Sequence, residues 1–286
     1  VACSGGPGEG PGEEPEVAQS TDFFGYLVDT PLLTTNAGSE VGSSSNTEAL
    51  SGRLYPAVFV PGPSGQMIPN TDLVTTQVLP GANRQVVYTL TENARYSDGV
   101  PVTCTDFLLH YKAGVHRSLF GSHLPQTEEV LRLDCEPGQK RFTVVFNENS
   151  GGRWRHLFGP GTVLPSHAVA AKAGLTENEL HTALVSDDWS TLSEVAPVWR
   201  DGFDLDSFDP ALQVTSGPFV IDRVGEQGEV LLVPNEHYYG DAPNLRTIVV
   251  WPGGTDPRPL NEAGALRIAD IRQGQFVDRD DPTNTL

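Results

Sequence analysis

The chain has 286 residues, of which 38% are hydrophobic, so it is long enough for one large domain or two ordinary ones. No apolar run reaches the length of about eighteen residues that a transmembrane helix needs, so we expect no membrane-spanning segment within it. Lys and Arg number 18 against 37 Asp and Glu, and the formal charge of −19 excludes nucleic acid as an expected partner.

The first residues resemble a lipoprotein processing site. Val1-Ala2-Cys3-Ser4 is similar to the end of a bacterial lipobox, in which the signal peptide is removed before a cysteine that becomes diacylated. The following residues are rich in Gly, Pro and Glu and offer almost nothing to bury. We therefore expect residues 1–21 to form a disordered tether with a lipid on Cys3. The alternative is a loose N-terminus with an accidental cysteine.

The next segment predicts one strand, a long loop and two short elements. Aromatic and aliphatic residues at 23–28 indicate a strand, and the polar, Gly- and Ser-rich stretch 34–46 indicates a loop. Residues 47–54 are a candidate for a short helix that packs through its leucines. The Pro-rich stretch 56–69 predicts turns around a short hairpin.

Alternating side chains predict two further strands, at 86–90 and 142–146. Between them, Thr103 and Asp106 have the spacing of a capping box, in which each residue satisfies a backbone N–H of the other at a helix N-terminus. This spacing predicts a helix over 104–114, with its apolar residues forming a buried face.

The remaining elements alternate irregularly. We expect a helix at 168–173, a β-rich stretch that opens at 216–221 and includes 230–233 and 245–251, and a last helix over 261–273. This order indicates a mixed α/β (α+β) class and not a regular doubly wound sheet.

Two cysteines remain after Cys3. In an exported protein such thiols are more often paired than free, so we expect a disulfide between Cys104 and Cys135 that joins the start of the helix to the neighbouring strand pair. Two unpaired buried thiols are the alternative.

The sequence offers no pattern that is typical of an enzyme or a metal site. Its seven His residues lack the helical spacing of a zinc hydrolase. The acidic stretch 201–209 resembles a calcium loop only superficially, because the central glycine and the terminal glutamate are missing, so we expect a solvated acidic turn. Phosphate-loop and nucleophile-elbow motifs are also missing. We therefore predict no catalytic residue, no metal ligand and no cofactor.

The chain resembles one protein family in three places. Residues 88–107, YTLTENARYSDGVPVTCTDF, resemble the signature of the family 5 extracellular solute-binding proteins, the receptors of ABC importers for oligopeptides, dipeptides and nickel. A second match comprises 216–219 and 235–245, and a weaker one covers 265–278. Tyr96 stands where the family usually has Trp, and Cys104 where it usually has Ala.

Further stretches resemble the actinobacterial lipoprotein branch of this family. They are the Cys104 and Cys135 pair and residues 153–158, RWRHLF, which precede the LPSH stretch at 164–167.

The resemblance implies the periplasmic-binding-protein-like type II fold (cluster C), of which this chain would form the first lobe. Residues 22–45 plus 188–278 would form the first subdomain of that lobe, and 46–187 an inserted second subdomain. Residues 279–286 would begin the crossover to a second lobe that lies outside this chain.

The resemblance also implies a function. The protein would be an extracytoplasmic solute-binding lipoprotein, and not an enzyme, that captures oligopeptides or similar solutes for the permease subunits of an ABC importer. A lipid would anchor it to the outer face of the cytoplasmic membrane. The alternative is a lipoprotein of the same fold and of the LpqW type, which acts in cell-envelope lipoglycan assembly.

The loop after the first strand contributes backbone groups to the ligand in this family. Its match here is Glu40, Val41, Gly42 and Ser43, which are the predicted ligand-binding residues. The alternative interpretation is a flexible loop that is exposed to solvent.

Overall fold

The structure is a computed structural model that describes residues 24–45, 47–244, 247–266 and 268–269. The predicted tether 1–21, with Cys3, and the predicted crossover 279–286 lie outside these residues. In the described part of the chain, no helix combines the length and the apolar character needed to cross a membrane.

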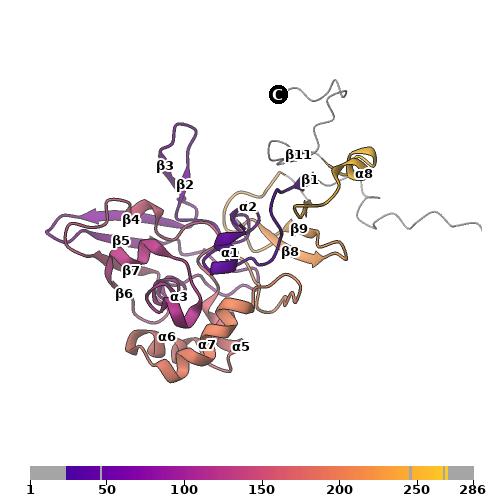
Figure 1. Ribbon diagram of the computed structural model, residues 1–286. Helices are drawn as coiled ribbons and strands as arrows, with labels where there is room; N and C mark the ends of the chain where they lie inside the picture. The colour runs from indigo at the N-terminus through magenta and orange to yellow at the C-terminus, as the bar shows by residue number, and fades with distance from the viewer. Residues whose placement is uncertain (1–23, 46, 245–246, 267, 270–286) are drawn as a thin grey trace, which may run out of the picture.

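The first of the two larger sheets combines both ends of the described chain (Figure 1). Its strand order is β11-β1-β10-β9-β8. The strands are β1 (Phe24–Leu27), β8 (Phe219–Val224), β9 (Val230–Pro234), β10 (Ile248–Trp251) and β11 (Ile268–Ala269). Strand β1 pairs in parallel with β10 and β11, whereas β9 is antiparallel to β8 and β10. All four side chains of β10 are buried, as expected for a central strand.

The second sheet is antiparallel and has the order β4-β5-β7-β6. Its strands are β4 (Val74–Leu79), β5 (Gln85–Leu90), β6 (Val130–Asp134) and β7 (Arg141–Phe146), which confirms the strands expected at 86–90 and 142–146. A separate hairpin, β2 (Phe59–Pro61) and β3 (Met67–Pro69), stands out from the body of the molecule, and its position confirms the predicted hairpin.

Helices cover the second sheet and join it to the rest of the chain (Figure 1). They are α3 (Cys104–Val115), α4 (Arg117–Phe120), α5 (Ser166–Lys172), α6 (Glu177–Ser186) and α7 (Trp189–Asp201). The rings of Tyr88, Phe107, Phe142 and Phe158 pack against one another between β5, β7, α3 and the chain before α5. One large apolar core runs through both sheets and these helices, and a smaller one joins β1 and β10 to residues 260–265.

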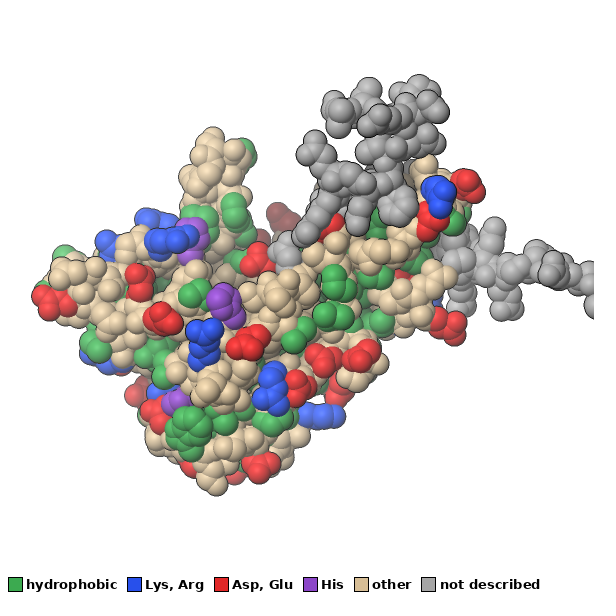
Figure 2. Space-filling model, in the orientation of Figure 1, with side chains coloured by type: hydrophobic (Ala, Val, Ile, Leu, Met, Phe, Trp, Pro, Cys, Tyr) green, Lys and Arg blue, Asp and Glu red, His purple; other side chains and the backbone are tan. Residues whose placement is uncertain are grey.

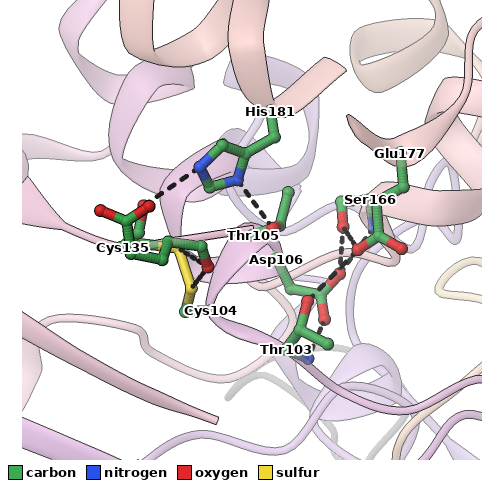
Figure 3. Close-up of a disulfide and its surroundings, with 9 residues drawn as sticks. Thr103, Cys104, Thr105, Asp106, Cys135, Ser166, Glu177 and His181 are labelled. Atoms are coloured by element: carbon green, nitrogen blue, oxygen red, sulfur yellow. Dashed lines mark hydrogen bonds between the residues drawn. A yellow bond between two sulfur atoms is a disulfide. The ribbon is translucent and has the colours of Figure 1, made fainter. Parts of the chain in front are cut away.

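Two carboxylates tie three helices together at the predicted capping box (Figure 3). The backbone N–H of Thr103 donates to Oδ2 of Asp106 at 2.9 Å, and Oδ1 of Asp106 accepts from the backbone N–H of Ser166 at 2.8 Å and from its hydroxyl at 2.5 Å. Glu177 lies beside them and accepts from the Thr103 hydroxyl at 3.2 Å. Asp106, which completes the capping box of α3, therefore also holds the start of α5.

The structure joins Cys104 to Cys135, with Cα atoms 5.9 Å apart, and thereby links the start of α3 to the chain after β6 (Figure 3). His181 of α6 supports the same corner. Its Nε2 donates to the carbonyl of Cys135 at 3.0 Å, which leaves Nδ1 to accept from the Thr105 hydroxyl at 2.9 Å.

The predicted loop 34–46 is not wholly a loop, because it contains the short helix α1 (Glu40–Ser44). Ser39 forms the N-cap, since its side chain accepts from the backbone N–H of Gly42 at 3.0 Å. A side-chain cap offsets the weak helix propensity of the Ser and Gly residues in this stretch. The next helix, α2 (Glu48–Ser51), falls within the predicted 47–54.

The predicted helix over 261–273 is wrong. The helix there is α8 (Pro257–Glu262), which begins at a side-chain cap from Asp256 with proline in its first turn. Gly264 has a φ of 69°, a conformation that ends the helix, and the chain then continues as β11. Part of the predicted range, 267 and 270–273, lies outside the described residues.

The proposed subdomain boundaries stay a prediction. Strands of the antiparallel sheet all come from 46–187, and those of the other sheet from 22–45 and 188–278. Helix α7 belongs to the predicted first subdomain, 22–45 plus 188–278. It packs, however, against α4, α5 and α6, which belong to the predicted inserted subdomain, 46–187.

Candidate ligand pocket

A pocket of about 380 Å³ lies at the foot of the β2–β3 hairpin. The loop around α1 and α2 forms one wall, the hairpin a second, and residues 123–126 and 155–162 the others. Side chains of Lys or Arg and of His gather beside the hairpin on the face shown in Figure 2. The volume lies within the range of pockets that bind small molecules.

Two aromatic rings, of which Phe59 lines the pocket, hold a cation at the pocket. Arg155 places its guanidinium carbon 4.6 Å from the ring centre of Trp154 and 6.0 Å from that of Phe59. The two rings meet edge to face, 5.2 Å apart. Ion pairs between described residues do not include Arg155. Stacking on rings thus positions a charge that no described carboxylate neutralises.

A buried histidine supplies a neutral polar group. His110 of α3 is 3% exposed and stacks edge to face with Phe158. Its Nδ1 lies 3.0 Å from the carbonyl oxygen of Thr162, and because a carbonyl only accepts, Nδ1 carries the proton. Burial lowers the pKa of His110 to about 4, so the ring is neutral at pH 7. Its Nε2 is an acceptor that has no hydrogen-bond partner among the described residues.

Other polar side chains complete the lining. Glu48 and Ser43 lie on the α1–α2 wall, whereas His123 and His156 approach from the other walls. Although three histidines line one pocket, the described residues contain no group of three or more His, Cys, Asp or Glu side chains placed to hold a metal ion.

The four predicted ligand-binding residues do not all line the same pocket. Ser43 lines the pocket, but Glu40 lines a separate, shallower depression beside Arg117. Val41 is 48% exposed, and Gly42 is buried with its backbone against that of Asn36. A ligand-binding role of these residues stays a prediction.

The base of this loop is held firmly. Residues 34–39 are buried, and Asn36 donates from Nδ2 to the carbonyl of Trp199 at 2.8 Å while its Oδ1 accepts from the backbone N–H of Gly38 at 2.9 Å. The hydroxyl of Thr35 donates to Oε1 of Gln213 at 2.9 Å. These contacts fix the segment that carries α1 onto α7 and the chain that follows it.

Sequence reasoning missed Arg155, His110 and Phe59 as pocket residues. Residues 153–158 stood out only through resemblance to one branch of the family, and His110 sits inside a helix whose buried face looked like ordinary core. Only tertiary contacts bring the three residues together, because they come from distant parts of the chain.

The comparison with protein families identifies the class. Residues 72–278 match the family described as "Bacterial extracellular solute-binding proteins, family 5 Middle". This match covers more than half of the chain, so the chain belongs to the family 5 extracellular solute-binding proteins.

Relatives among known proteins are lipoproteins and peptide-binding proteins. Uncharacterised lipoproteins of Mycobacterium bovis and Mycobacterium tuberculosis are each 29% identical to the chain over 259 residues, which is 87% of this chain and 46% of theirs. The oligopeptide-binding protein OppA of Mycobacterium tuberculosis is 23% identical over 212 residues, 72% of this chain and 31% of that protein. The chain thus spans about half the length of its lipoprotein relatives, and the part that matches OppA covers about a third of that protein.

Solved structures share the fold. The periplasmic EDTA-binding protein EppA matches 90% of this chain with 46% of its own, at a TM-score of 0.69 and 21% identity. The NikZ protein of Campylobacter jejuni, solved with Ni(L-His), matches 87% of this chain with 43% of its own, at a TM-score of 0.62 and 14% identity. An oligopeptide-binding protein of Thermus thermophilus, solved with a pentapeptide, matches 87% of this chain with 42% of its own, at a TM-score of 0.55 and 16% identity. The fold is therefore the predicted mixed α/β, periplasmic-binding-protein-like fold.

Proposed function

We propose that the protein captures oligopeptides or similar solutes outside the cytoplasm and delivers them to the permease of an ABC importer. The observation that carries this proposal is the match of residues 72–278 to a family of extracellular solute-binding proteins. The pocket at the foot of the hairpin supports it, because it combines apolar surface with a few polar groups in the way that small-molecule sites do.

The described wall suits a ligand with varied side chains. Phe59, Met67 and Phe158 supply apolar surface, whose contacts do not depend on the orientation of the ligand. Arg155 and His110 supply polar groups, whose hydrogen bonds do. A receptor that holds the main chain of a peptide by polar contacts and its side chains by loose apolar contacts tolerates many sequences.

Capture requires a second wall. The chain covers 46% of its lipoprotein relatives, and we propose that the remaining part forms a lobe that closes over the solute by hinge motion. A single wall should bind solutes weakly, since association has the same entropic cost while half of the contacts are lost.

A lipid on Cys3 would hold the receptor at the outer face of the cytoplasmic membrane. The lipobox-like start of the sequence and the lipoprotein names of the mycobacterial relatives support this location. Metabolic labelling with palmitate tests it, because Cys3→Ser should abolish incorporation and release the protein from the membrane. Incorporation by the variant would contradict the anchor.

The test of function is mass spectrometry of the small molecules that co-purify with the full-length protein. The proposal expects a defined set of peptides or related solutes that is lost after denaturation and restored by dialysis against a peptide mixture. Co-purification of a glycolipid instead would contradict the proposal and favour a role in envelope assembly.

A further inference from the structure

The polar lining of the pocket narrows the class of solute. We propose that the pocket binds the carboxylate-bearing end of the solute, with Arg155 as its ion partner and Nε2 of His110 accepting a hydrogen bond from an N–H or O–H group of the same solute. This inference rests on the proposed function and specifies its substrate class. A peptide C-terminus combines a carboxylate with an amide N–H, which are the two groups that this proposal requires.

The argument for a carboxylate begins with the geometry of Arg155. Trp154 and Phe59 approach its guanidinium at 4.6 and 6.0 Å. The two rings are nearly perpendicular, at 89°, so the guanidinium can lie face-on to only one of them, and the N–H groups along its edge can bind another partner. That edge makes two parallel hydrogen bonds with a planar carboxylate. Within the described chain, Arg155 belongs to no ion pair, so a solute can supply the anion.

The lining of the pocket is less acidic than the chain as a whole. The chain carries 37 acidic residues against 18 basic ones, and yet Arg155 lines a pocket whose lining has one carboxylate, Glu48. His123 and His156 are the other titratable groups that border it along with His110. Glu48 repels an anion of high charge, so a singly charged carboxylate suits the pocket better than a phosphate.

His110 adds the second requirement. The Thr162 carbonyl occupies Nδ1 at 3.0 Å, and this bond fixes the ring so that Nε2 is the remaining acceptor. The side chain is 3% exposed and lines the pocket, so a solute would reach it through the pocket. The buried polar atoms without a partner among the described residues do not include Nε2, so this acceptor is accessible from the pocket and can bond to a donor on the solute.

The experiment is an NMR titration of the 286-residue chain with N-acetyl-L-leucine and with N-acetyl-L-leucinamide, which lacks the carboxylate. We expect the acid to bind about tenfold more tightly than the amide, as a charge-assisted hydrogen-bond pair implies. Arg155→Gln should reduce this difference to less than about twofold. Arg153→Gln is the matched control, because Arg153 is exposed and does not line the pocket, and it should keep the full difference.

The role of His110 is tested with N-acetyl-N-methyl-L-leucine, in which the amide hydrogen is replaced by methyl. Wild type should bind this probe several-fold more weakly than N-acetyl-L-leucine. The His110→Asn variant retains an N–H for the Thr162 carbonyl but lacks Nε2, so it should bind both probes alike. A thermal melt similar to that of wild type shows that the variant is folded. A variant that still prefers the N–H probe would overturn the role of His110.

Three results would overturn the carboxylate inference. They are equal binding of acid and amide by wild type, retention of the difference by Arg155→Gln, and no chemical-shift change with either probe at millimolar concentration. Equal binding of acid and amide leaves the proposed solute-binding function standing, because a neutral solute is then captured. Failure of that function is seen separately, in the molecules that co-purify with the full-length protein.

Discussion

Among single residues, Asp106 combines structural and electrostatic roles. It is 1% exposed, caps α3 and accepts two hydrogen bonds from Ser166. Burial and the nearby negative charge of Glu177 raise its pKa from 3.8 to about 6, although the hydrogen bonds oppose this rise. The folded protein therefore holds a proton on Asp106 at pH values where the unfolded chain has lost it.

The sign of the pH effect follows from this difference. Between about pH 4 and 6 the folded state binds more protons than the unfolded state, so the free energy of unfolding falls as pH rises through this window. Asp106→Asn cannot titrate. We expect its stability relative to wild type to increase by about 3 kcal/mol between about pH 4 and pH 7, measured by urea unfolding.

Controls separate this effect from general destabilisation. The amide that replaces the carboxylate in the Asp106→Asn variant cannot accept from both Thr103 and Ser166, so the variant should lose about 1 kcal/mol or more at low pH. Gly152→Ala, which changes no titratable group, should show no such pH dependence. A constant difference between Asp106→Asn and wild type across the window would show that Asp106 keeps an ordinary pKa.

Among elements, the corner where α3 meets β6 depends on the disulfide. Cys104 and Cys135 are 31 residues apart, and closing a loop of that length stabilises a fold by about 3–4 kcal/mol in the chain-entropy model. The double variant Cys104→Ala, Cys135→Ala should lose about this much in urea unfolding. Reductant should destabilise wild type and leave the variant unchanged. Equal unfolding midpoints for wild type and variant would contradict the predicted contribution.

Helix α1 depends on a glycine. A Cβ atom on Gly42 would lie 1.8 Å from the backbone oxygen of Asn36, which itself is fixed to α7. Gly42→Ala should therefore displace α1 and lower the free energy of unfolding by about 1–3 kcal/mol, as overpacking does. The matched control is Gly152→Ala, where a Cβ would have no atom within 4 Å. Similar melting temperatures for the two variants would show that α1 adapts without cost.

The elements that sequence could predict are those with strong local signals. Alternation located β5 and β7, and the capping spacing of Thr103 and Asp106 located α3 to within a residue. The last predicted helix failed because Leu266 and Ile268 fit a helical spacing, whereas Gly264 ends α8 and Ile268 pairs with Tyr26 of β1. Strand pairing across more than two hundred residues leaves no local signal.

The pocket was less predictable than the elements. Ser43 was named from the family resemblance and lines the pocket, but Glu40 faces another depression because α1 turns it away. Arg155 contacts the ring of Phe59, which lies on a hairpin almost a hundred residues earlier in the chain. No spacing rule connects such residues, since their contact is produced by the packing of the whole fold.

At the scale of the whole molecule, the proposed function makes the chain one wall of a solute receptor. The hairpin stands at one side of the pocket, and α6 and α7 lie away from the hairpin at the other end of the molecule (Figure 1). Solute binding should therefore affect the hairpin side and leave the helical side unchanged.

Hydrogen–deuterium exchange with and without a pool of short peptides tests this claim most directly. We predict slower exchange in peptides that contain residues 43–48, 59–69, 123–126 and 155–162, with no change in α6 and α7. Protection confined to α6 and α7, or exchange that the peptides leave unaltered everywhere, would contradict the assignment of the pocket as the solute-binding wall.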